Sequence, residues 1–369
     1  MPGHLFSPLP SATLMLRRNI PLSRSSAIPR TAKPSCVEHS RCAAFLLPLR
    51  LFSGIIFCLT LSLAQTSTAA EAWRVGTWKT AQTIQPFLYQ HYAAPFAPDT
   101  TVTVLPFTNP ADQKAALLAG SLDMTGTTLA LAIQAASRGE PVRLVAALVN
   151  KCSALVVRKD GPILSSADLK GKRIAYVPGT MHEILLREVL HREGIDADRD
   201  VSLMRIDFFD MGTALAKNDV DAFLSGEPFP TQAVQQGYGR ILAYPYFGDS
   251  IGTINAGMLM RSDFIAEHPE QAMRMVATHK AVTEALRSDI SLWLDTAASL
   301  FGVDKAVLKA AAPNMELAWD MDDAFVQQVA ALGKRMKELG IIQKEPDYAT
   351  LVDRTFVDAL RAGKRTLHE

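Results

Sequence analysis

Short apolar segments alternate with helix-forming segments along most of this 369-residue chain, beginning at Trp73. Turn-forming residues bound the apolar segments, which cover 73–78, 101–107, 122–126, 142–149 and 153–159. Helical patterns separate the first four of them, over 84–93, 110–120 and 128–139. Because a helix between two strands lets the strands run side by side in the same direction, this alternation predicts an α/β fold with mostly parallel sheets.

The same rhythm then starts again. Strand patterns cover 173–177, 201–208 and 220–226, and helical patterns cover 182–193, 211–218 and 231–237. The stretch "ALLAGSLDMTG" (116–126) is weakly similar to "ALAKNDVDAFLSG" (214–226), since each has a helix end, a turn, an apolar–Asp pair and a small-residue exit. This repetition indicates two similarly wound lobes. From His268 to Ala362 the pattern is nearly all helical, so we expect a helical C-terminal region.

The N-terminal part of the chain differs from the rest. Residues 1–46 are rich in Ser, Pro and Arg without an apolar period, which predicts a disordered basic extension. A basic flank ending at Arg50, a short apolar core (51–64) and small residues up to Ala70 predict a signal peptide over 47–70. The alternative is a retained membrane anchor, although the apolar core is short for one. The extension is open to two interpretations, a transit-like segment or an overlong gene start.

Charge and cysteine content restrict the function classes. Seven of the 38 Lys and Arg residues and one of the 37 acidic residues fall in 1–50, which leaves a net charge of about −5 on the remainder. A mildly acidic body disfavours nucleic-acid binding. Three of the four cysteines precede residue 71, so a processed chain would keep only Cys152, which we expect to be a buried structural thiol. The sequence predicts neither a metal site nor a cofactor.

The stretch "RIAYVPGTMHEILLREVLHREG" (173–194) carries the clearest candidate for a ligand contact. An apolar strand runs into Pro178-Gly179-Thr180, and a helix begins at once. Thr180 can cap that helix, and its first backbone N–H groups could then bind an anion or a polar ligand atom. The alternative is an ordinary strand-to-helix connection.

These motifs resemble a known family. "SADLKGKRIAYVPGT" (166–180), followed about forty residues later by "ALAKNDVDAFLSGEPF", resembles the periplasmic solute-binding proteins of ABC importers. The resemblance is strongest to the branch that handles nitrate, taurine and aliphatic sulfonates, and thiamine-pyrimidine precursors. It extends over roughly 73–361, and "GSLDMTGTT" (120–128) matches a first-lobe element of that branch.

The resemblance implies a type II periplasmic-binding-protein fold with two lobes and a cleft that closes on its ligand. Lobe one would comprise 71–153 plus 255–369, and lobe two would be the insert 154–254. The crossing segments near Lys151–Ser153 and Ile251–Asn255 would act as hinges. Such lobes place their loops at the carboxyl ends of parallel strands, where ligands bind.

Candidate contacts from lobe one follow its first three strands. Trp78 and Thr80 follow the first strand, and Trp78 could stack on a flat ligand or pack as a surface aromatic. Asn109 follows the second strand and is expected to cap a helix rather than to contact ligand. Thr125, Gly126 and Thr127 form the strongest candidate. Gly126 allows a ligand to approach the backbone closely, and the neighbouring hydroxyls surround a helix start. The alternative is that one hydroxyl simply caps the helix.

Candidate contacts from lobe two are Gly179, Thr180 and Met181 at the helix start already described, which we expect to face 125–128 across the cleft. Asp210 follows the "IDFF" strand and could cap the next helix. Glu227 follows "AFLSG"; its carboxylate could accept hydrogen bonds from an amine or a heterocycle N–H, or could cap the helix near Thr231.

Two functions remain open. The first is an extracytoplasmic binding component, secreted to the periplasm as a monomer, that delivers a small solute to an ABC permease and ATPase in the inner membrane. The solute would be a sulfonate, a nitrate-like anion or a pyrimidine-type heterocycle. The second is an enzyme on the same fold, such as one in pyrimidine-precursor biosynthesis. The chain has no recognisable nucleophile, phosphate-binding loop or metal motif, and His182 fits a helix residue better than a base. We therefore predict a protein without enzymatic activity.

Overall fold

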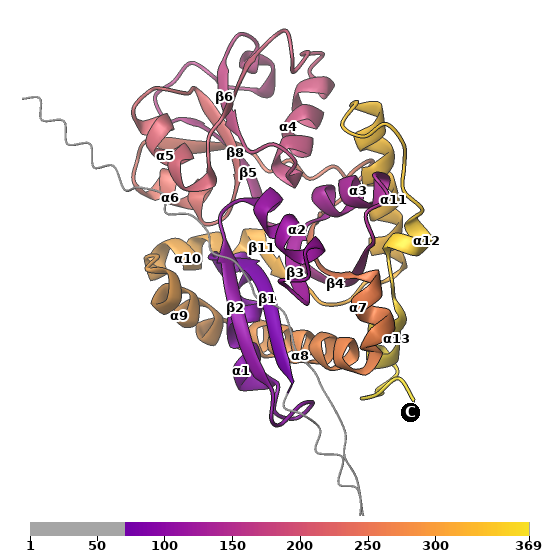
Figure 1. Cartoon of the computed structure of the whole chain (residues 1–369). Helices are drawn as coiled ribbons and strands as arrows, with labels where there is room; N and C mark the ends of the chain where they lie inside the picture. Colours follow the sequence, from indigo (N-terminus) through magenta and orange to yellow (C-terminus); the bar gives the residue numbers. More distant parts are fainter. Residues whose placement is uncertain (1–70, 369) are drawn as a thin grey trace, which may run out of the picture. The chain divides into compact units, whose positions relative to one another are not determined.

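The computed structural model describes residues 71–368, so the predicted extension (1–46) and signal peptide (47–70) lie outside the described residues. The chain from 71 to 368 forms two β-sheets with helices around them (Figure 1). None of the helices in this range has both the length and the apolar character that a membrane-spanning segment needs.

The first sheet has six strands in the order β11-β4-β10-β3-β1-β2. Strand β1 is parallel to β2 and β3, whereas β10 runs antiparallel to β3 and β4, and β11 runs antiparallel to β4. The strands are β1 (Ala72–Trp78), β2 (Thr101–Phe107), β3 (Met124–Thr128), β4 (Val142–Lys151), β10 (Ile254–Arg261) and β11 (Met315–Leu317).

The second sheet has five strands in the order β7-β6-β8-β5-β9. It repeats the arrangement of the first, because β6 is parallel to β7 and β8, and β5 runs antiparallel to β8 and β9. Its strands are β5 (Ser153–Arg158), β6 (Arg173–Tyr176), β7 (Ser202–Arg205), β8 (Ala222–Gly226) and β9 (Gly239–Ala243).

An Arg–Asp clasp holds the same position in each sheet. Asp123 precedes β3, and its carboxylate accepts hydrogen bonds from the backbone N–H of Arg74 at 2.7 Å and from the Arg74 Nε at 3.2 Å. Asp221 precedes β8 and accepts from Arg173 in the same way, at 3.0 and 3.1 Å. These are the Asp residues of the two similar stretches in the sequence, so the similarity reflects a shared way of joining neighbouring parallel strands.

Helices connect the strands within both lobes. Around the first sheet they are η1 (Ala81–Thr83), η2 (Gln85–Leu88), α1 (Tyr89–Tyr92), α2 (Pro110–Leu118) and α3 (Leu129–Ser137). Around the second sheet they are η3 (Ser166–Leu169), α4 (Met181–Arg192), α5 (Phe208–Ala216) and α6 (Phe229–Gln235). The C-terminal region holds α7 (Ser262–Glu267), α8 (Pro269–Ser288), α9 (Ile290–Phe301), α10 (Lys305–Ala311), η4 (Ala312–Asn314), α11 (Asp323–Glu338), α12 (Tyr348–Leu351) and α13 (Thr355–Arg361).

Within the part of the chain that the structure describes, the backbone passes between the sheets twice, and the two passages touch. Lys151 and Cys152 join β4 to β5 with left-handed backbone angles, φ 59° and 73°. The backbone N–H of Lys151 donates to the Thr253 carbonyl, just before β10, at 2.6 Å. Cys152 is a free, fully buried thiol, as predicted, and burial raises its pKa.

The structure confirms the two-lobed α/β fold with a helical C-terminal region, but the sheets are mixed rather than mostly parallel. The parallel strands form one triplet in each sheet, β2-β1-β3 and β7-β6-β8. The strands β5 and β10, which carry the chain across, enter each sheet in the opposite direction. The residue bounds predicted for the lobes stay predictions.

Some element bounds also differ from the predicted ones. The strand predicted over 201–208 ends at Arg205, and α5 begins at Phe208 rather than 211. Residues 84–93 are divided between 3₁₀ and α turns. Strands β9, β10 and β11 were not predicted. β11 has only three residues, and its pairing with β4 is a long-range contact that a local sequence pattern cannot predict.

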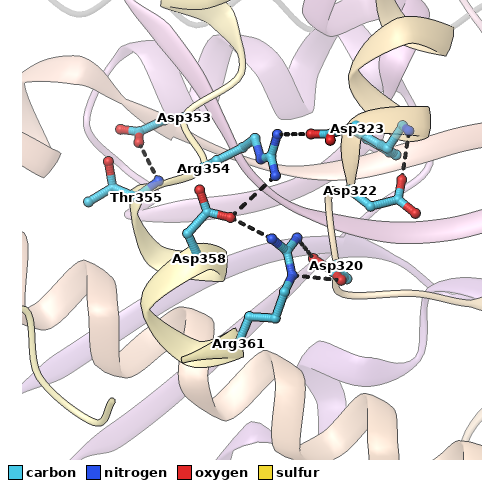
Figure 2. A network of polar contacts seen from close by, with 9 residues as sticks. Asp320, Asp322, Asp323, Asp353, Arg354, Thr355, Asp358 and Arg361 are labelled. Carbon is cyan, nitrogen blue, oxygen red and sulfur yellow. Dashed lines mark hydrogen bonds and ion pairs between the residues drawn. The ribbon is translucent and has the colours of Figure 1, made fainter. Parts of the chain in front are cut away.

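Ion pairs attach the C-terminal helix α13 to the start of α11 (Figure 2). Arg354 donates to Asp323 at 2.6 Å, and Arg361 donates to Asp358 at 2.7 Å and also pairs with Asp320. The carboxylates are well exposed, so each pair contributes little alone. The network therefore fixes the position of α13 rather than supplying much stability.

A buried histidine joins three parts of the first lobe. His279 of α8 is fully buried, and its Nδ1 lies 2.8 Å from the Tyr89 hydroxyl. Its Nε2 lies 2.8 Å from the Ala147 carbonyl oxygen and 3.2 Å from that of Ala318. Nε2 must therefore carry the proton, and Nδ1 accepts from Tyr89. Burial lowers the pKa of His279 to about 4, so the ring is neutral in the folded protein at neutral pH.

We predict that the free energy of unfolding falls as the pH falls from about 6.5 to about 4. Over this window the unfolded chain binds a proton at His279 that the folded chain does not, so acid favours unfolding. The measurement is urea unfolding at pH 5.5 and at pH 4.5. Between these two values the parent should lose up to about 1.4 kcal/mol more unfolding free energy than His279→Gln, because glutamine does not titrate. Equal pH slopes in the two proteins would refute this role for His279.

Candidate functional site

A small cavity of about 20 Å³, here called the central pocket, lies at the carboxyl ends of the parallel strands. From the first sheet and its connections it is lined by Trp78, Thr80, Gln82, Phe107, Thr108 and Thr128. From the second sheet and its connections it is lined by His182, Phe208, Phe209, Gly226 and Phe229. Both lobes therefore contribute to one cavity, as a cleft-binding site requires.

Aromatic rings form most of the walls. Phe209 and Phe229 meet edge to face with ring centroids 5.2 Å apart, and His182 and Phe208 meet in the same way at 5.3 Å. Trp78, at the end of β1, also lines the pocket and is only 9% exposed. Such walls favour the faces and edges of a flat, apolar ligand.

Gln82 is the most conspicuous polar group of the central pocket. Its side chain is 6% exposed, and its Oε1 has no hydrogen-bond partner among the residues that the structure describes. A buried acceptor without a partner is unfavourable, so a ligand N–H or O–H there would be stabilising. Gly226 leaves room for this amide, because a Cβ at that position would lie 2.8 Å from Gln82 Nε2.

His182 supplies a neutral imidazole to the central pocket. It is 3% exposed, and burial lowers its pKa to about 3. Its Nδ1 lies 3.1 Å from the Ser153 hydroxyl oxygen, which accepts from Asn255 at 3.2 Å. Either group can be the donor in the Ser153–His182 contact; where the Ser153 hydroxyl donates to Nδ1, Nε2 of His182 carries the proton and can donate to a ligand.

Among the described residues, no Lys, Arg, Asp or Glu lines the central pocket. An ionised ligand buried there would lose its hydration without gaining an opposite charge. The arrangement therefore suits an uncharged ligand better than a charged one.

The predicted contacts of lobe one are divided. Trp78 and Thr80 line the central pocket. Thr125, Gly126 and Thr127 are buried in β3 and do not line it; the Thr125 hydroxyl accepts from Gln113 Nε2 at 2.7 Å. Thr128, one residue further, reaches the lining and caps α3.

The helix start at 179–181 is already occupied by its own side chains. Gly179 has φ +75°, and its N–H donates to the Glu183 carboxylate at 2.7 Å. Thr180 caps α4, as predicted, and Met181 is fully buried. The backbone donors that the sequence offered to a ligand are therefore partly used by Glu183, and none of these three residues lines the central pocket.

The remaining predicted contacts lie outside the central pocket. Asn109 caps α2, accepting from Ala111 N at 2.8 Å, and Asp210 is exposed in the first turn of α5 rather than at its cap, which is Asp207. Glu227 is fully buried behind Gly226; its carboxylate accepts from Thr231 N at 3.1 Å and from Asn314 Nδ2 at 3.2 Å. Burial raises the pKa of Glu227.

A second cavity, here called the flank cavity, has a volume of about 270 Å³. It is lined by Asn109, Pro110, Ala111, Lys114, Leu131, Gln134, Arg138, Val177, Pro178, Gly179, Arg205 and Asp207. Two of the predicted contacts, Asn109 and Gly179, therefore face this cavity instead.

The aromatic walls and Gln82 are not among the contacts predicted from the sequence. The available signal was the position of Phe107, which ends β2, and of Phe208, Phe209 and Phe229, which lie a few residues after β7 and β8. Aromatic residues at the carboxyl ends of parallel strands are candidates for pocket walls. Gln82 carried no comparable signal, because a polar residue in a short turn is ordinarily solvated.

Comparisons with known proteins agree with this geometry. The family described as NMT1/THI5 like matches residues 99–288. A Brucella abortus protein named as a binding protein is 31% identical over 211 residues, which cover 56% of this chain and 64% of that protein. The chain thus matches somewhat less than two thirds of that relative's length.

Two further relatives differ in what their names describe. The 4-amino-5-hydroxymethyl-2-methylpyrimidine phosphate synthase of Schizosaccharomyces pombe is 25% identical over 205 residues, covering 52% of this chain and 60% of that enzyme. The alkanesulfonate-binding protein SsuA of Xanthomonas axonopodis pv. citri, solved with bound MOPS, aligns with a TM-score of 0.69 at 22% identity. That alignment covers 78% of this chain and all of SsuA, and it shows a common fold.

We predict that Gly226→Ala costs about 1–3 kcal/mol of unfolding free energy, because the new Cβ must displace the buried Gln82 amide. Urea unfolding should show a smaller cost in a Gln82→Ala background, where that amide is absent. Gly248→Ala is the matched control, since nothing lies within 4 Å of its Cβ position. If Gly226→Ala costs the same with and without Gln82, the two residues do not share the space described here.

Proposed function

This chain belongs to the NMT1/THI5-like family, and we propose that it is the extracytoplasmic solute-binding component of an ABC-type importer. In this proposal the lobes, 71–153 plus 255–369 and 154–254, close on a small solute held in the central pocket. The observation that carries the proposal is a cavity lined by both lobes, with aromatic walls and no charged side chain among its described lining residues.

We further propose that the solute is an uncharged, planar heterocycle of the pyrimidine type. The rings of Trp78, Phe107 and Phe229 offer stacking and edge contacts to such a molecule. The unpartnered Gln82 Oε1 can accept from a ring N–H or an amino group, and Gln82 Nε2 and His182 can donate to ring nitrogens or carbonyl oxygens.

A nitrate-like anion or a sulfonate fits the central pocket less well. Recognition of a buried anion usually depends on Arg, Lys or several free backbone N–H groups. Within residues 71–368 no Lys or Arg lines the central pocket, and the Gly179 N–H is occupied by Glu183. The alkanesulfonate bound by the structurally similar SsuA is therefore not the solute that we propose for this chain.

The proposed partners are an ABC permease and its ATPase, and the proposed location is the periplasm, reached through the signal peptide at 47–70. A monomer that carries one solute at a time matches this role. The crossing segments near Lys151–Ser153 and Ile251–Asn255 would serve as hinges, because the described strands change from one sheet to the other between β4 and β5 and between β9 and β10.

The alternative is an enzyme, for which the distant similarity to a pyrimidine phosphate synthase is the supporting observation. His182 would be the candidate base. A pKa of about 3 makes it a poor proton acceptor at neutral pH, and its Nδ1 is already engaged with Ser153. We therefore favour binding without turnover.

We predict that uncharged pyrimidines, screened by thermal shift on the purified protein, raise the melting temperature more than taurine or nitrate does. Linkage gives about 2.7 kcal/mol of stabilisation at a hundredfold excess over the dissociation constant. Replacement of an aromatic wall residue, Trp78→Ala or Phe229→Ala, should weaken binding by about 1–3 kcal/mol for the lost stacking.

Tyr92→Ala serves as the aromatic control, because Tyr92 ends α1 and does not line the central pocket. Stabilisation by taurine or nitrate alone, unaffected by Trp78→Ala, would show that the solute class is wrong. Conversion of a bound pyrimidine by the purified protein, abolished by His182→Gln, would establish the enzyme instead.

A further inference from the structure

The flank cavity lies next to the central pocket along the boundary between the lobes. Residues adjacent in the chain line the two cavities. Thr108 and Phe208 line the central pocket, and their neighbours Asn109 and Asp207 line the flank cavity. Both sheets contribute to its wall: α2 and α3 accompany the first sheet, and the turns after β6 and β7 belong to the second.

The flank cavity holds the positive charge that the central pocket lacks. Arg138 caps the end of α3 on one wall, and Arg205 ends β7 on the other. Both are exposed, and neither guanidinium has a hydrogen-bond or ion-pair partner among the described residues. Lys114 also lines the cavity, but its ammonium group is held by Glu140 at 2.7 and 2.8 Å.

A buried donor points to a missing ligand at the same boundary. Gln134 Nε2 is buried and has no hydrogen-bond partner among the described residues. The Gln134 amide lies 3.8–3.9 Å from the position that a Cβ on Gly179 would occupy, so it faces the turn of the opposite lobe. A buried N–H group without an acceptor is unfavourable unless a bound group accepts from it.

We propose that the flank cavity binds an oxyanion, a phosphate, sulfate, sulfonate or carboxylate group, between Arg138 of one lobe and Arg205 of the other. The planar guanidinium groups match the oxygen geometry of such groups, and Gln134 Nε2 donates a further hydrogen bond. The start of α4 contributes little, because Glu183 already accepts from Gly179. Asp207 is the acidic residue in the described lining, and it weakens the site.

An oxyanion that bridges the two walls favours the closed arrangement of the lobes, because both guanidinium groups can reach it only when the walls are close. The oxyanion could be a free inorganic ion or an acidic group on the solute. The site is inferred from its own residues and does not require the solute class proposed above.

The first experiment titrates the purified protein with sodium sulfate by calorimetry in a buffer of low ionic strength, where exposed charges are least screened. Arg138→Gln and Arg205→Gln should each weaken sulfate binding by about tenfold or more, the change expected on losing one charge-assisted contact. Asp207→Asn should strengthen it. Arg287→Gln on α8 makes the same change of charge outside the cavity and should leave binding unchanged.

The proposal is overturned if sulfate does not bind, or if it binds equally well to the parent, Arg138→Gln and Arg205→Gln.

A second experiment identifies the source of the oxyanion by comparing uracil with orotate, the carboxylate derivative of uracil. Loss of orotate affinity in the two Arg variants, with uracil unaffected, assigns the anion to the solute. Enhancement of uracil binding by sulfate assigns it to a separate ion. If neither pyrimidine binds while sulfate does, the solute proposal fails and the flank site stands.

Discussion

The Arg–Asp clasp that occurs once in each sheet underlies the rest of the architecture. Arg74 with Asp123 and Arg173 with Asp221 join the first strand of each parallel triplet to its neighbour, through the backbone N–H as well as the guanidinium. Because the contact involves the backbone, it fixes the strand register as well as a charge pair. The three strands of each triplet then end at the same edge, and the residues that follow them converge on one cavity.

The distribution of charge between the two cavities is the second organising feature. The central pocket is enclosed by rings and lined by neutral polar groups, so that burying an ion there would be costly. The guanidinium groups of Arg138 and Arg205 lie instead at the more open flank, where water still solvates them. In the proposed function this segregation would let one cleft distinguish a flat neutral group from an acidic one, and it is the reason for proposing a heterocycle rather than a free anion in the central pocket.

The central pocket is also connected to the passage between the lobes. Ser153 is the first residue after that passage, and its hydroxyl contacts His182 in the pocket lining. The backbone N–H of Ser153 donates to the Tyr246 hydroxyl, and Tyr246 in turn donates to Asn314 at 2.6 Å. Asn314 holds the buried carboxylate of Glu227. Hydrogen bonds therefore connect His182 to both passages, and the proposed closure of the lobes would act on this network.

The sequence by itself determined the elements whose cause is local. Apolar runs bounded by turns predicted the strands β1, β2, β4, β5, β6 and β8. Local patterns also predicted Thr180 and Asn109 as helix caps, and the two similar stretches indicated two lobes.

The tertiary structure alone decided the strand directions across the lobes, the three-residue strand β11 and the composition of the site. Trp78 and Thr80, which line the central pocket, could be named as candidates from the sequence because they lie at the end of a strand, whereas Gln82 and the phenylalanines come together only where two distant lobes meet. At 179–181 the local pattern was correct but incomplete, since the first acceptor for the exposed N–H groups is Glu183 of the same helix. Local hydrogen bonding follows from neighbours in the chain, while a pocket depends on which surfaces pack together, and that information is long-range.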